Sequence, residues 1–337
     1  MNKEHFPLLV TGLLGIPGYN AFSYFRNRYT HPVIGIRPSH NNTLKGNGIV
    51  PISAEDFPKL TELFATYKFK TIIDASGCCA LKSCEFDKET ATLVNRDLGV
   101  KIAELAGIYQ SRLLRFSTDL VFAGREEGLY AETSSPCPIT IYGKTMYQAE
   151  IAIRQMYPPA VILRIALPMG PSFNGHAGPI DWIESRFKKG LHATLFYDEI
   201  RSNIYIQDIL KVLEWFIENK HKGLFHLGGP KVLSLYQIAQ IINKLGNYDP
   251  DLLKGSFRRE AYCLPPRVGN VSMNTHKITS LLPKDVIKPW PYNPQQIPTD
   301  RRWHFKRNGS GNSRDAIKKE LNGYKPNQEE RHPIHWH

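Results

Sequence analysis

The spacing of three glycines near the amino terminus constrains the fold of this 337-residue chain more than any other feature. Gly12, Gly15 and Gly18 follow the apolar run Phe6–Val10 and precede a helical pattern, in the order TGxxGxxG. Gly12 permits a tight turn from strand to helix, Gly15 lets a phosphate approach the backbone, and Gly18 lets the helix pack against the sheet. The helix N-terminus then favours negative charge. The loop is therefore predicted to bind a dinucleotide, with a purely structural turn as the alternative.

Short apolar runs alternate with helical patterns through the first half of the chain. Leu98, Ile102 and Leu105, for example, fall on one face of a helix between two such runs. Strands that alternate with helices form βαβ units, and right-handed crossovers make the parallel sheet doubly wound. We therefore expect an α/β fold of the Rossmann type. The expected strands are Phe6–Val10, Val33–Ile36, Thr71–Ile73, Leu113–Phe116 and Val161–Ile165.

The second half changes character and predicts a smaller α/β domain. Apolar residues at helical spacing mark two amphipathic helices, the second of which starts after Ser234 and stops at Gly246. We place a dinucleotide-binding domain at residues 1–165 and a mainly substrate-binding domain at 166–290, with some segments returning to the first domain. Residues 291–337 are expected to form a basic tail that contains proline and glycine and is partly flexible.

The second predicted strand ends at Arg37 rather than at an acidic residue. In dinucleotide-binding folds an acidic side chain at this place hydrogen-bonds the ribose 2′-hydroxyl of NAD, whereas an arginine accommodates the 2′-phosphate of NADP. The sequence here reads RPSH, without Asp or Glu. Because a guanidinium pairs well with a phosphate, we expect NADP(H) in preference to NAD(H). A solvent-facing Arg37 beside NAD is the alternative.

The charge balance narrows the classes of partner. Lys and Arg exceed Asp and Glu by 43 − 31 = +12, and residues 301–331 hold nine basic and four acidic residues, or +5 of that total. The body of the chain has no compact stripe of basic and aromatic residues, so nucleic acid is not an expected partner. The basic tail could instead recruit an acidic protein partner.

Membrane and metal signals are lacking in the sequence. No stretch of about 18 apolar residues occurs, so a membrane is not an expected partner. The five cysteines form no disulfide framework, and Cys78-Cys79-x4-Cys84 lacks the paired histidines of a zinc spacing. We expect packing thiols, no metal and a cytoplasmic location.

Two further motifs occur in the order typical of one family. Residues 117–124 read STDLVFAG directly after a predicted strand, and residues 142–150 read YGKTMYQAE. Together with the glycine loop they resemble the extended short-chain dehydrogenase/reductases. Within that superfamily they are most similar to the dTDP-4-dehydrorhamnose reductase family, which reads STDYVFDG and YGKTKLxGE. The resemblance covers about residues 6–285.

The resemblance implies an oxidoreductase that acts on a nucleotide-sugar, as in dTDP-rhamnose biosynthesis. In this family a hydride moves from the nicotinamide to the C4 ketone of a nucleotide-linked deoxysugar. The tyrosine at the position of Tyr142 lies against the cofactor and donates a proton to the developing alkoxide, and the hydroxyl at the position of Thr118 hydrogen-bonds the same oxygen. The expected function is thus an NADP(H)-dependent reductase of a nucleotide-diphosphate 4-keto-deoxysugar.

The chain departs from the family at Met146. The family has a lysine four residues after its tyrosine, which binds the nicotinamide ribose and lowers the tyrosine pKa. Residues i and i+4 share a helix face, whereas Lys144 lies about 200° around the helix from Tyr142. A lysine placed at 146 is therefore expected to raise activity and strengthen cofactor binding. The departure also leaves open a catalytically impaired regulatory or sensor protein, for which the β subunit of methionine adenosyltransferase is a precedent in the family.

Three residues are expected to face the substrate. Asp119 follows Thr118 at the carboxyl edge of the sheet, where ligands bind in open α/β folds. A structural turn is its alternative, and the residue also leaves a sugar-nucleotide epimerase or dehydratase open. Arg201 and Arg267 stand where family members carry substrate-facing arginines, and each could hold a diphosphate or a structural salt bridge. The sugar, the nucleotide and the oligomeric state, including a homodimer, stay open.

Overall fold

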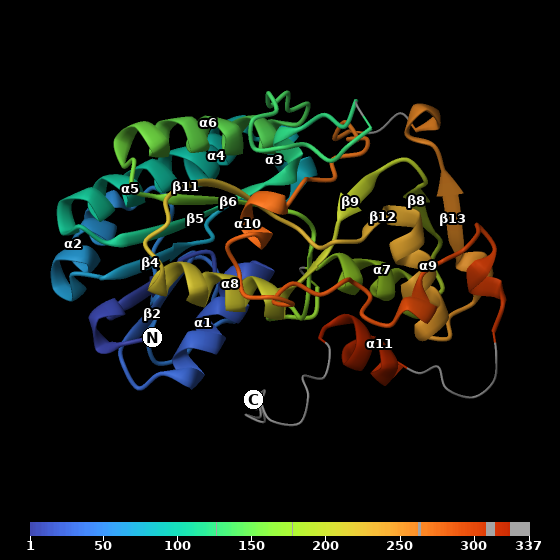
Figure 1. Ribbon diagram of the computed structural model, residues 1–337, viewed down its shortest axis with the longest axis horizontal. Helices are drawn as coiled ribbons and strands as arrows, with labels where there is room; N and C mark the ends of the chain where they lie inside the picture. The colour runs from blue at the N-terminus through green and yellow to red at the C-terminus, as the bar shows by residue number, and fades with distance from the viewer. Residues whose placement is uncertain (126, 177, 262–263, 308–313, 324–337) are drawn as a thin grey trace.

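Two lobes make up the protein (Figure 1). The computed structural model describes residues 1–337 except 126, 177, 262–263, 308–313 and 324–337. The larger lobe is built on a seven-stranded sheet in the order β11-β6-β5-β4-β1-β2-β3, in which all neighbours are parallel. Its strands are β1 (Leu8–Val10), β2 (Val33–Arg37), β3 (Ile49–Pro51), β4 (Thr71–Asp74), β5 (Arg112–Thr118), β6 (Val161–Ile165) and β11 (Gly223–Leu227).

Helices cover both faces of this sheet, as Figure 1 shows. One apolar core lies between the sheet and the helices α1 (Ile16–Arg28), α8 (Ile206–Glu218) and α10 (His276–Thr279). A second core lies on the opposite face, under α2 (Phe57–Tyr67), α5 (Leu98–Tyr109) and α6 (Ile141–Met156). The short helices α3 (Leu81–Phe86) and α4 (Lys88–Thr92) pack against α6 on that side. The expected doubly wound α/β fold is confirmed.

The strand order reverses between β1 and β4, and this reversal places the site. The chain runs outward through β2 and β3 on one side of β1, and through β4, β5 and β6 on the other. In open α/β sheets the crevice at the carboxyl ends of the strands beside such a reversal is where ligands bind. The glycine loop at residues 11–18, the loop after β4 and the motif after β5 all leave the sheet at this edge.

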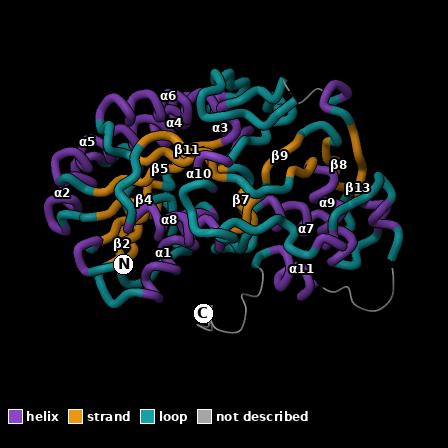
Figure 2. The backbone as a smooth tube through the Cα atoms, viewed as in Figure 1, coloured by secondary structure: helices purple, strands orange, loops and turns teal. Residues whose placement is uncertain are grey.

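The smaller lobe consists of three two-stranded pairs and three helices around its own apolar core. Its elements are β7 (Pro168–Met169) with β10 (Ile204–Tyr205), β8 (Ala193–Phe196) with β13 (Leu253–Ser256), β9 (Ile200–Ser202) with β12 (Val232–Ser234), and the helices α7 (Pro179–Lys188), α9 (Leu235–Leu245) and α11 (Arg314–Leu321). β11 and α8 follow several of these strands in the chain but belong to the larger lobe, so the chain crosses between the lobes more than once (Figure 2).

Part of the segment expected as a tail packs into the smaller lobe. Trp303 and Ile317 are buried in its core. The buried Trp290 donates its indole N–H to the carbonyl oxygen of Leu321 at 3.0 Å, which fastens α11 to the lobe. Residues 308–313 and 324–337 of the expected tail lie outside the described residues.

Local sequence signals account for the helix ends near the site. Ser234 accepts from the Gln237 N–H and Gln237 accepts from the Ser234 N–H, which is a reciprocal capping box at the start of α9. Thr140 caps α6 in a similar way, because its hydroxyl accepts from the Gly143 N–H at 3.0 Å. The expected start of α9 after Ser234 and its end at Gly246 are confirmed.

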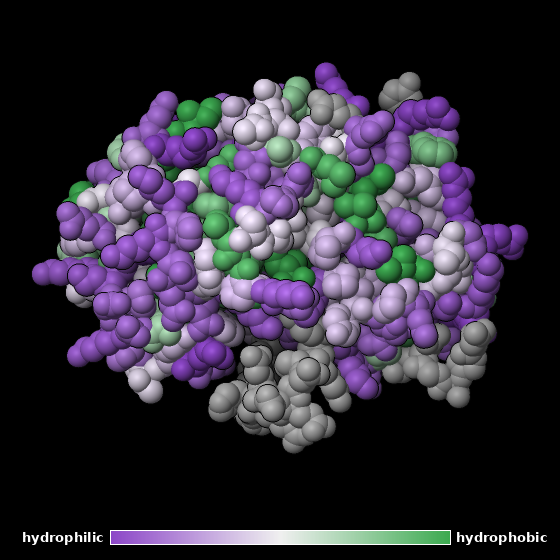
Figure 3. Space-filling model, viewed as in Figure 1, coloured by the Kyte–Doolittle hydropathy of each residue, from purple (hydrophilic) through white to green (hydrophobic). Residues whose placement is uncertain are grey.

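Single helical turns connect the longer elements at Lys3–His5, Leu93–Asp97, Asp119–Val121, Pro250–Leu252, Arg258–Glu260, Pro294–Gln296 and Trp303–Phe305. Among the described residues, no helix is both long and apolar enough to cross a membrane. On the face drawn in Figure 3, hydrophilic side chains cover most of the larger lobe, and hydrophobic side chains lie mainly toward the middle of the view.

A buried histidine joins β11 to the chain that leaves β5. The His226 Nδ1 lies 3.0 Å from the Tyr130 carbonyl oxygen, so this nitrogen carries the proton. Its Nε2 lies 3.3 Å from Arg164 Nη1, which donates to it. Burial, together with Arg164 and against the opposing Glu132 carboxylate, lowers the pKa of His226 to about 4. The imidazole is therefore neutral in the folded protein at neutral pH.

The depressed pKa of His226 predicts a loss of stability in mild acid. Between pH 6.5 and about 4 the unfolded chain binds a proton at this residue that the folded protein does not bind. The free energy of unfolding therefore falls as the pH decreases through this window, by up to about 3 kcal/mol. Denaturant titrations at pH 7 to 4 should show a smaller decrease for His226→Asn, whereas the exposed His276→Asn should follow the wild type. Equal slopes for all three proteins would contradict this assignment.

Candidate functional site

Two glycines of the loop are required by the backbone that surrounds them. Gly12 has φ +68°, and a Cβ there would lie 2.0 Å from the Ala75 carbonyl oxygen. A Cβ on Gly18 would lie 2.3 Å from the Gly12 carbonyl oxygen. Because neither position can hold a side chain, the loop folds tightly between β1, α1 and the segment after β4.

The third glycine is free of such crowding. Gly15 caps α1 with an extended backbone, and the nearest atom to a Cβ there is the Gly12 carbonyl oxygen at 3.5 Å. A small group therefore has room at Gly15, at the start of a 13-residue helix. That space, at a helix N-terminus beside the reversal of strand order, fits the phosphates of a dinucleotide.

Arg37 is the last residue of β2 and lies next to the glycine loop. Leu13 of the loop donates its N–H to the Ile36 carbonyl oxygen at 3.4 Å. The Arg37 Nη1 donates to the carbonyl oxygens of Pro38 at 2.9 Å and Ser39 at 3.3 Å, which holds the guanidinium at the carboxyl end of the strand. Its buried Nε has no hydrogen-bond partner among the described residues.

The structure brings Thr118 and Tyr142 together at the carboxyl end of β5. Thr118 ends that strand, and Tyr142 lies in the first turn of α6. Burial is the main cause that raises the pKa of Tyr142, with a smaller contribution from Cys79. A hydrogen bond between the side chains of Tyr142 and Thr118, and the charge of Arg115, oppose that rise. Tyr142 therefore keeps its proton at neutral pH, as a proton donor must.

Asp119 and Arg201 also lie at this place, and they bind each other. The Arg201 Nε and Nη2 donate to the two carboxylate oxygens of Asp119 at 2.6 and 2.5 Å. Both side chains are buried, and the Arg201 charge acts on Tyr142. Such a bidentate pair fixes the plane of both groups. The pair ties the motif after β5 to β9 of the smaller lobe.

Arg267 lies against the buried carboxylate of Glu199, which was not among the expected site residues. Its Nη1 is 3.7 Å from Glu199 Oε2, longer than a hydrogen bond. The Arg267 Nε and the Glu199 Oε2 are buried without a hydrogen-bond partner among the described residues. Burial raises the pKa of Glu199, and Arg267 and Arg201 oppose that rise. Glu199 directly precedes β9 and lies two residues before Arg201, and this i, i+2 spacing is the signal that could have identified it.

An ion pair beneath the site was also missed. The Arg115 Nη1 donates to Asp74 Oδ2 at 2.8 Å, and both side chains are buried. The other oxygen of Asp74 accepts from the hydroxyls of Thr11 and Ser76, each at 2.6 Å. One carboxylate thus holds the start of the glycine loop, the loop after β4, and β5.

Met146 and Lys144 lie as the helical spacing predicts. Met146 is buried on the inner side of α6, one turn after Tyr142, whereas Lys144 is exposed. The lysine therefore cannot reach the position one turn after the tyrosine. The sulfur of Met146 lies 3.8 Å from Nη2 of Arg115.

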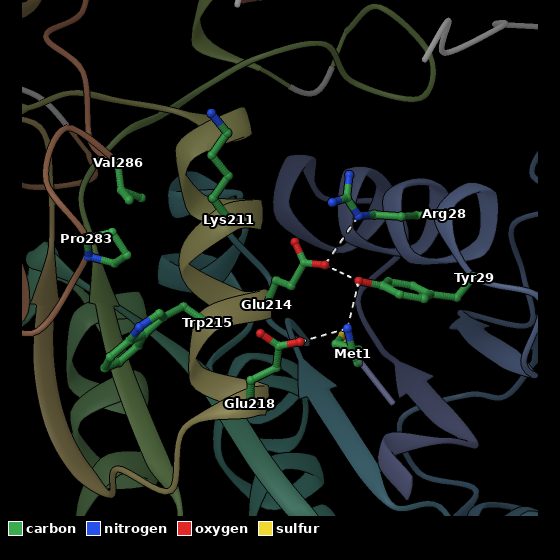
Figure 4. A pocket seen from close by; sticks show the side chains of 9 residues that line it. All are labelled: Met1, Arg28, Tyr29, Lys211, Glu214, Trp215, Glu218, Pro283 and Val286. Carbon is green, nitrogen blue, oxygen red and sulfur yellow. Dashed lines mark hydrogen bonds and ion pairs between the residues drawn. The ribbon is translucent and has the colours of Figure 1, made fainter. Parts of the chain in front are cut away.

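A hollow elsewhere on the larger lobe is separate from these residues (Figure 4). It measures about 340 Å³ and lies among α1, α8 and the segment 283–286. Glu214 pairs with Arg28 at 3.3 Å, and Glu218 pairs with the terminal amine of Met1 at 2.7 Å. None of the expected site residues lines it.

The fold and the site can now be compared with known proteins. The family described as RmlD substrate binding domain matches residues 10–296. This chain belongs to that family. The expected extended short-chain dehydrogenase/reductase relationship is thereby confirmed. The relatives of this chain include proteins named dTDP-4-dehydrorhamnose reductase and others named methionine adenosyltransferase 2 subunit beta.

Three relatives show the range of names among the similar proteins. A probable low-salt glycan biosynthesis reductase of Haloferax volcanii is 25% identical over 252 residues, 73% of this chain and 82% of that protein. The dTDP-4-dehydrorhamnose reductase of Aggregatibacter actinomycetemcomitans is 28% identical over 211 residues, 58% and 70% of the two chains. The methionine adenosyltransferase 2 subunit beta of Xenopus laevis is 26% identical over 238 residues, 68% and 69% of the two chains.

Solved structures agree with the fold. A hypothetical dTDP-4-dehydrorhamnose reductase from Sulfolobus tokodaii has a TM-score of 0.72 at 23% identity, covering 83% of this chain and 96% of that one. The dTDP-4-dehydrorhamnose reductase of Bacillus anthracis, in complex with NADP, has a TM-score of 0.68 at 18% identity, covering 81% and 92%. At these identities the likeness extends to the fold alone.

Gly15 is uncrowded, whereas Gly12 and Gly18 are not. A substitution at Gly15 should therefore change cofactor binding without changing stability. Gly15→Ala should leave the melting temperature unchanged, because a Cβ there meets nothing closer than 3.5 Å. It should weaken NADPH binding by about tenfold or more, since the methyl group occupies the space in front of the helix N-terminus. Fluorescence titration measures the affinity, and Gly107→Ala, an uncrowded glycine on α5, is the matched control. Unchanged affinity in Gly15→Ala would rule out this loop as the phosphate site.

Proposed function

We propose that this protein is an NADP(H)-dependent reductase of a nucleotide-diphosphate 4-keto-deoxysugar, similar to dTDP-4-dehydrorhamnose reductase. The observation that carries the proposal is the contact of Tyr142 with Thr118 at the carboxyl end of β5, on the same sheet edge as the open space at Gly15. The named reductases among the relatives support it.

The proposed reaction needs a hydroxyl that holds the ketone oxygen and an acid that protonates it. A bound nicotinamide supplies the hydride. Thr118 binds the carbonyl oxygen, and Tyr142 gives its proton to that oxygen as negative charge develops there. Burial raises the pKa of Tyr142, so the proton stays on its oxygen until negative charge develops on the ketone. Reduction suits this arrangement better than alcohol oxidation, which requires the phenolate at the start.

For the cofactor we propose NADP(H), with the phosphates at Gly15 and the 2′-phosphate at Arg37. The Bacillus anthracis relative was solved with NADP, which supports a nicotinamide dinucleotide here. The Arg37 guanidinium is held at the end of β2 by two carbonyl oxygens, so it is already oriented beside the loop. A preformed cation loses little side-chain entropy when it binds a phosphate.

For the substrate diphosphate we propose Arg267 as the contact. It is partly exposed and only loosely paired with Glu199. Arg201 has a different role from Arg267, because two of its N–H groups already donate to the Asp119 carboxylate. It would shape the site through Asp119 and present its remaining N–H groups to the substrate. The same pairing leaves Asp119 without a free oxygen for acid–base work, so an epimerase or dehydratase is less well supported than a reductase.

A regulatory protein is the second candidate function, and Met146 is the observation that favours it. Methionine offers neither a charge nor a hydrogen-bond donor to the nicotinamide ribose. The similarity to methionine adenosyltransferase 2 subunit beta supports this alternative. In this case the protein would bind NADP(H) and a nucleotide-sugar-like ligand without turnover.

Consumption of NADPH with a dTDP-4-keto-6-deoxy sugar separates the two candidates. The wild type should oxidise NADPH, and Tyr142→Phe should lower kcat by about 100-fold or more, because the ketone oxygen loses its acid. The NADPH affinity of Tyr142→Phe should change little, and Tyr147→Phe on the same helix is the control. Tight NADPH binding with no turnover by the wild type would instead favour the regulatory protein.

The choice between NADPH and NADH depends on Arg37. Arg37→Met should weaken NADPH binding by about tenfold or more while leaving NADH binding nearly unchanged, because only NADPH carries the 2′-phosphate. Arg26→Met, a surface arginine of α1, should alter neither affinity. An equal loss for both cofactors would show that Arg37 has a structural role only.

A further inference from the structure

A buried guanidinium fills the space beside Met146. Arg115, on β5, is 1% exposed, and its Nη2 lies 3.8 Å from the Met146 sulfur. The same nitrogen donates to the Asn95 carbonyl oxygen at 2.8 Å. The other terminal nitrogen donates to Asp74 at 2.8 Å and to the Ser76 hydroxyl at 2.6 Å. The side chain of Arg115 is thus held from β4, from the turn before α5 and from α6.

Strand register, a wide turn and a glycine together leave room for the Arg115 side chain. Arg115 faces Asp74 in register across the strand pair β4 and β5. The wide turn Leu93–Asp97 brings the Asn95 carbonyl oxygen to the guanidinium. Gly99, in the first turn of α5, lies directly against it, since a Cβ there would be 3.2 Å from Arg115 Cζ. A larger residue at 99 would press on the guanidinium.

The buried charges next to Met146 sum to zero in the structure. This space holds one buried carboxylate, Asp74, and one buried cation, Arg115. A lysine at 146 would add a second buried cation without an anion to pair with it, which is strongly unfavourable in a site closed to water. Met146 is the neutral side chain that the arrangement allows. This balance predicts the opposite of the gain that the sequence led us to expect from a lysine at 146 alone.

We propose that Arg115 is a positioning residue that supplies, from strand β5, a positive charge close to Tyr142, and that Met146 is its neutral partner on α6. This role of Arg115 in turnover rests on the proposed reductase function. The geometry supports it because Met146 lies one helical turn from Tyr142 and contacts Arg115 directly. In addition, Arg115 opposes the effect of burial on the pKa of Tyr142.

The charge matters at the moment of proton transfer. The Tyr142 O–H bond breaks, its proton forms the O–H bond of the product alcohol, and the tyrosine keeps the electron pair as phenolate. The ketone carbon is reduced by the hydride, and NADPH is oxidised to NADP⁺. A proton from water then restores Tyr142. A cation close to a buried phenolate lowers the cost of forming it.

A double-mutant cycle tests whether the buried space between β5 and α6 accepts one positive charge and no more. It compares the wild type, Met146→Lys, Arg115→Met and the double variant, measured by melting temperature and by NADPH affinity. Each single variant unbalances the buried charge, so each should melt lower and bind NADPH about tenfold or more weakly. The double variant carries one cation and one carboxylate again and should recover most of both losses. Gln148→Lys adds the same charge at an exposed position of α6 and should resemble the wild type.

Two results of the cycle would overturn the proposal. One is a double variant that loses at least the sum of the two single losses. The other is a Met146→Lys protein that matches Gln148→Lys in both measurements. Where a single variant does not fold, the double variant decides: folding with NADPH binding upholds the proposal, and failure to fold overturns it. None of these measurements needs a substrate, so they stand even where the proposed reductase activity fails.

A neutral pair separates the electrostatic role from a merely structural one. Asp74→Asn combined with Arg115→Gln keeps amide groups in the space but removes both charges. Its NADPH affinity and its KM for the sugar should stay near the wild-type values, whereas kcat should fall by about tenfold or more, because the phenolate loses its cation. An unchanged kcat would overturn the role in turnover. A wild type without turnover would contradict the proposed function and not the location of the charge.

Discussion

The ion pair between Asp74 and Arg115 is the interaction on which the site depends. Two buried charges destabilise a fold unless they are paired and fully hydrogen-bonded, and removing one partner leaves the other uncompensated. Here the remaining oxygen of Asp74 is used by Thr11 and Ser76, and the remaining donors of Arg115 reach Ser76 and Asn95. The glycine loop, the loop after β4 and the turn before α5 therefore take their positions from one pair.

On the inner face of α6, successive helical turns contact successive polar groups of the sheet. Tyr142 meets Thr118 at the edge of the sheet, and Met146 meets Arg115 one turn further. Glu150, a further turn along, pairs with Arg164 of β6 at 2.7 Å. Each turn of the helix thus faces a polar group on the sheet. The central turn differs because α6 presents a neutral side chain, Met146, to the cation on the strand, which connects the departure at Met146 to the electrostatics of the tyrosine.

Local and periodic features could be predicted from the sequence, and long-range pairs could not. The glycine loop, the cap at Ser234 and the burial of Met146 follow from short spacings and helix geometry, so their structural predictions hold. The partner of Asp119 is 82 residues away and that of Asp74 is 41 away, and a single sequence carries no signal for such pairs. The packing of Trp303 was missed for a related reason, because proline-rich, basic composition conceals a core residue.

The most direct test of the account follows a label from the cofactor to the sugar. NADPH that carries deuterium at C4 of the nicotinamide is incubated with the protein and a dTDP-4-keto-6-deoxy sugar, and the product is analysed by mass spectrometry and NMR. We expect one deuterium on the carbon that was the ketone, and about 100-fold less labelled product from Tyr142→Phe in a reaction run for the same time. Labelled NADPH that binds the protein tightly and leaves the sugar unlabelled would contradict the account.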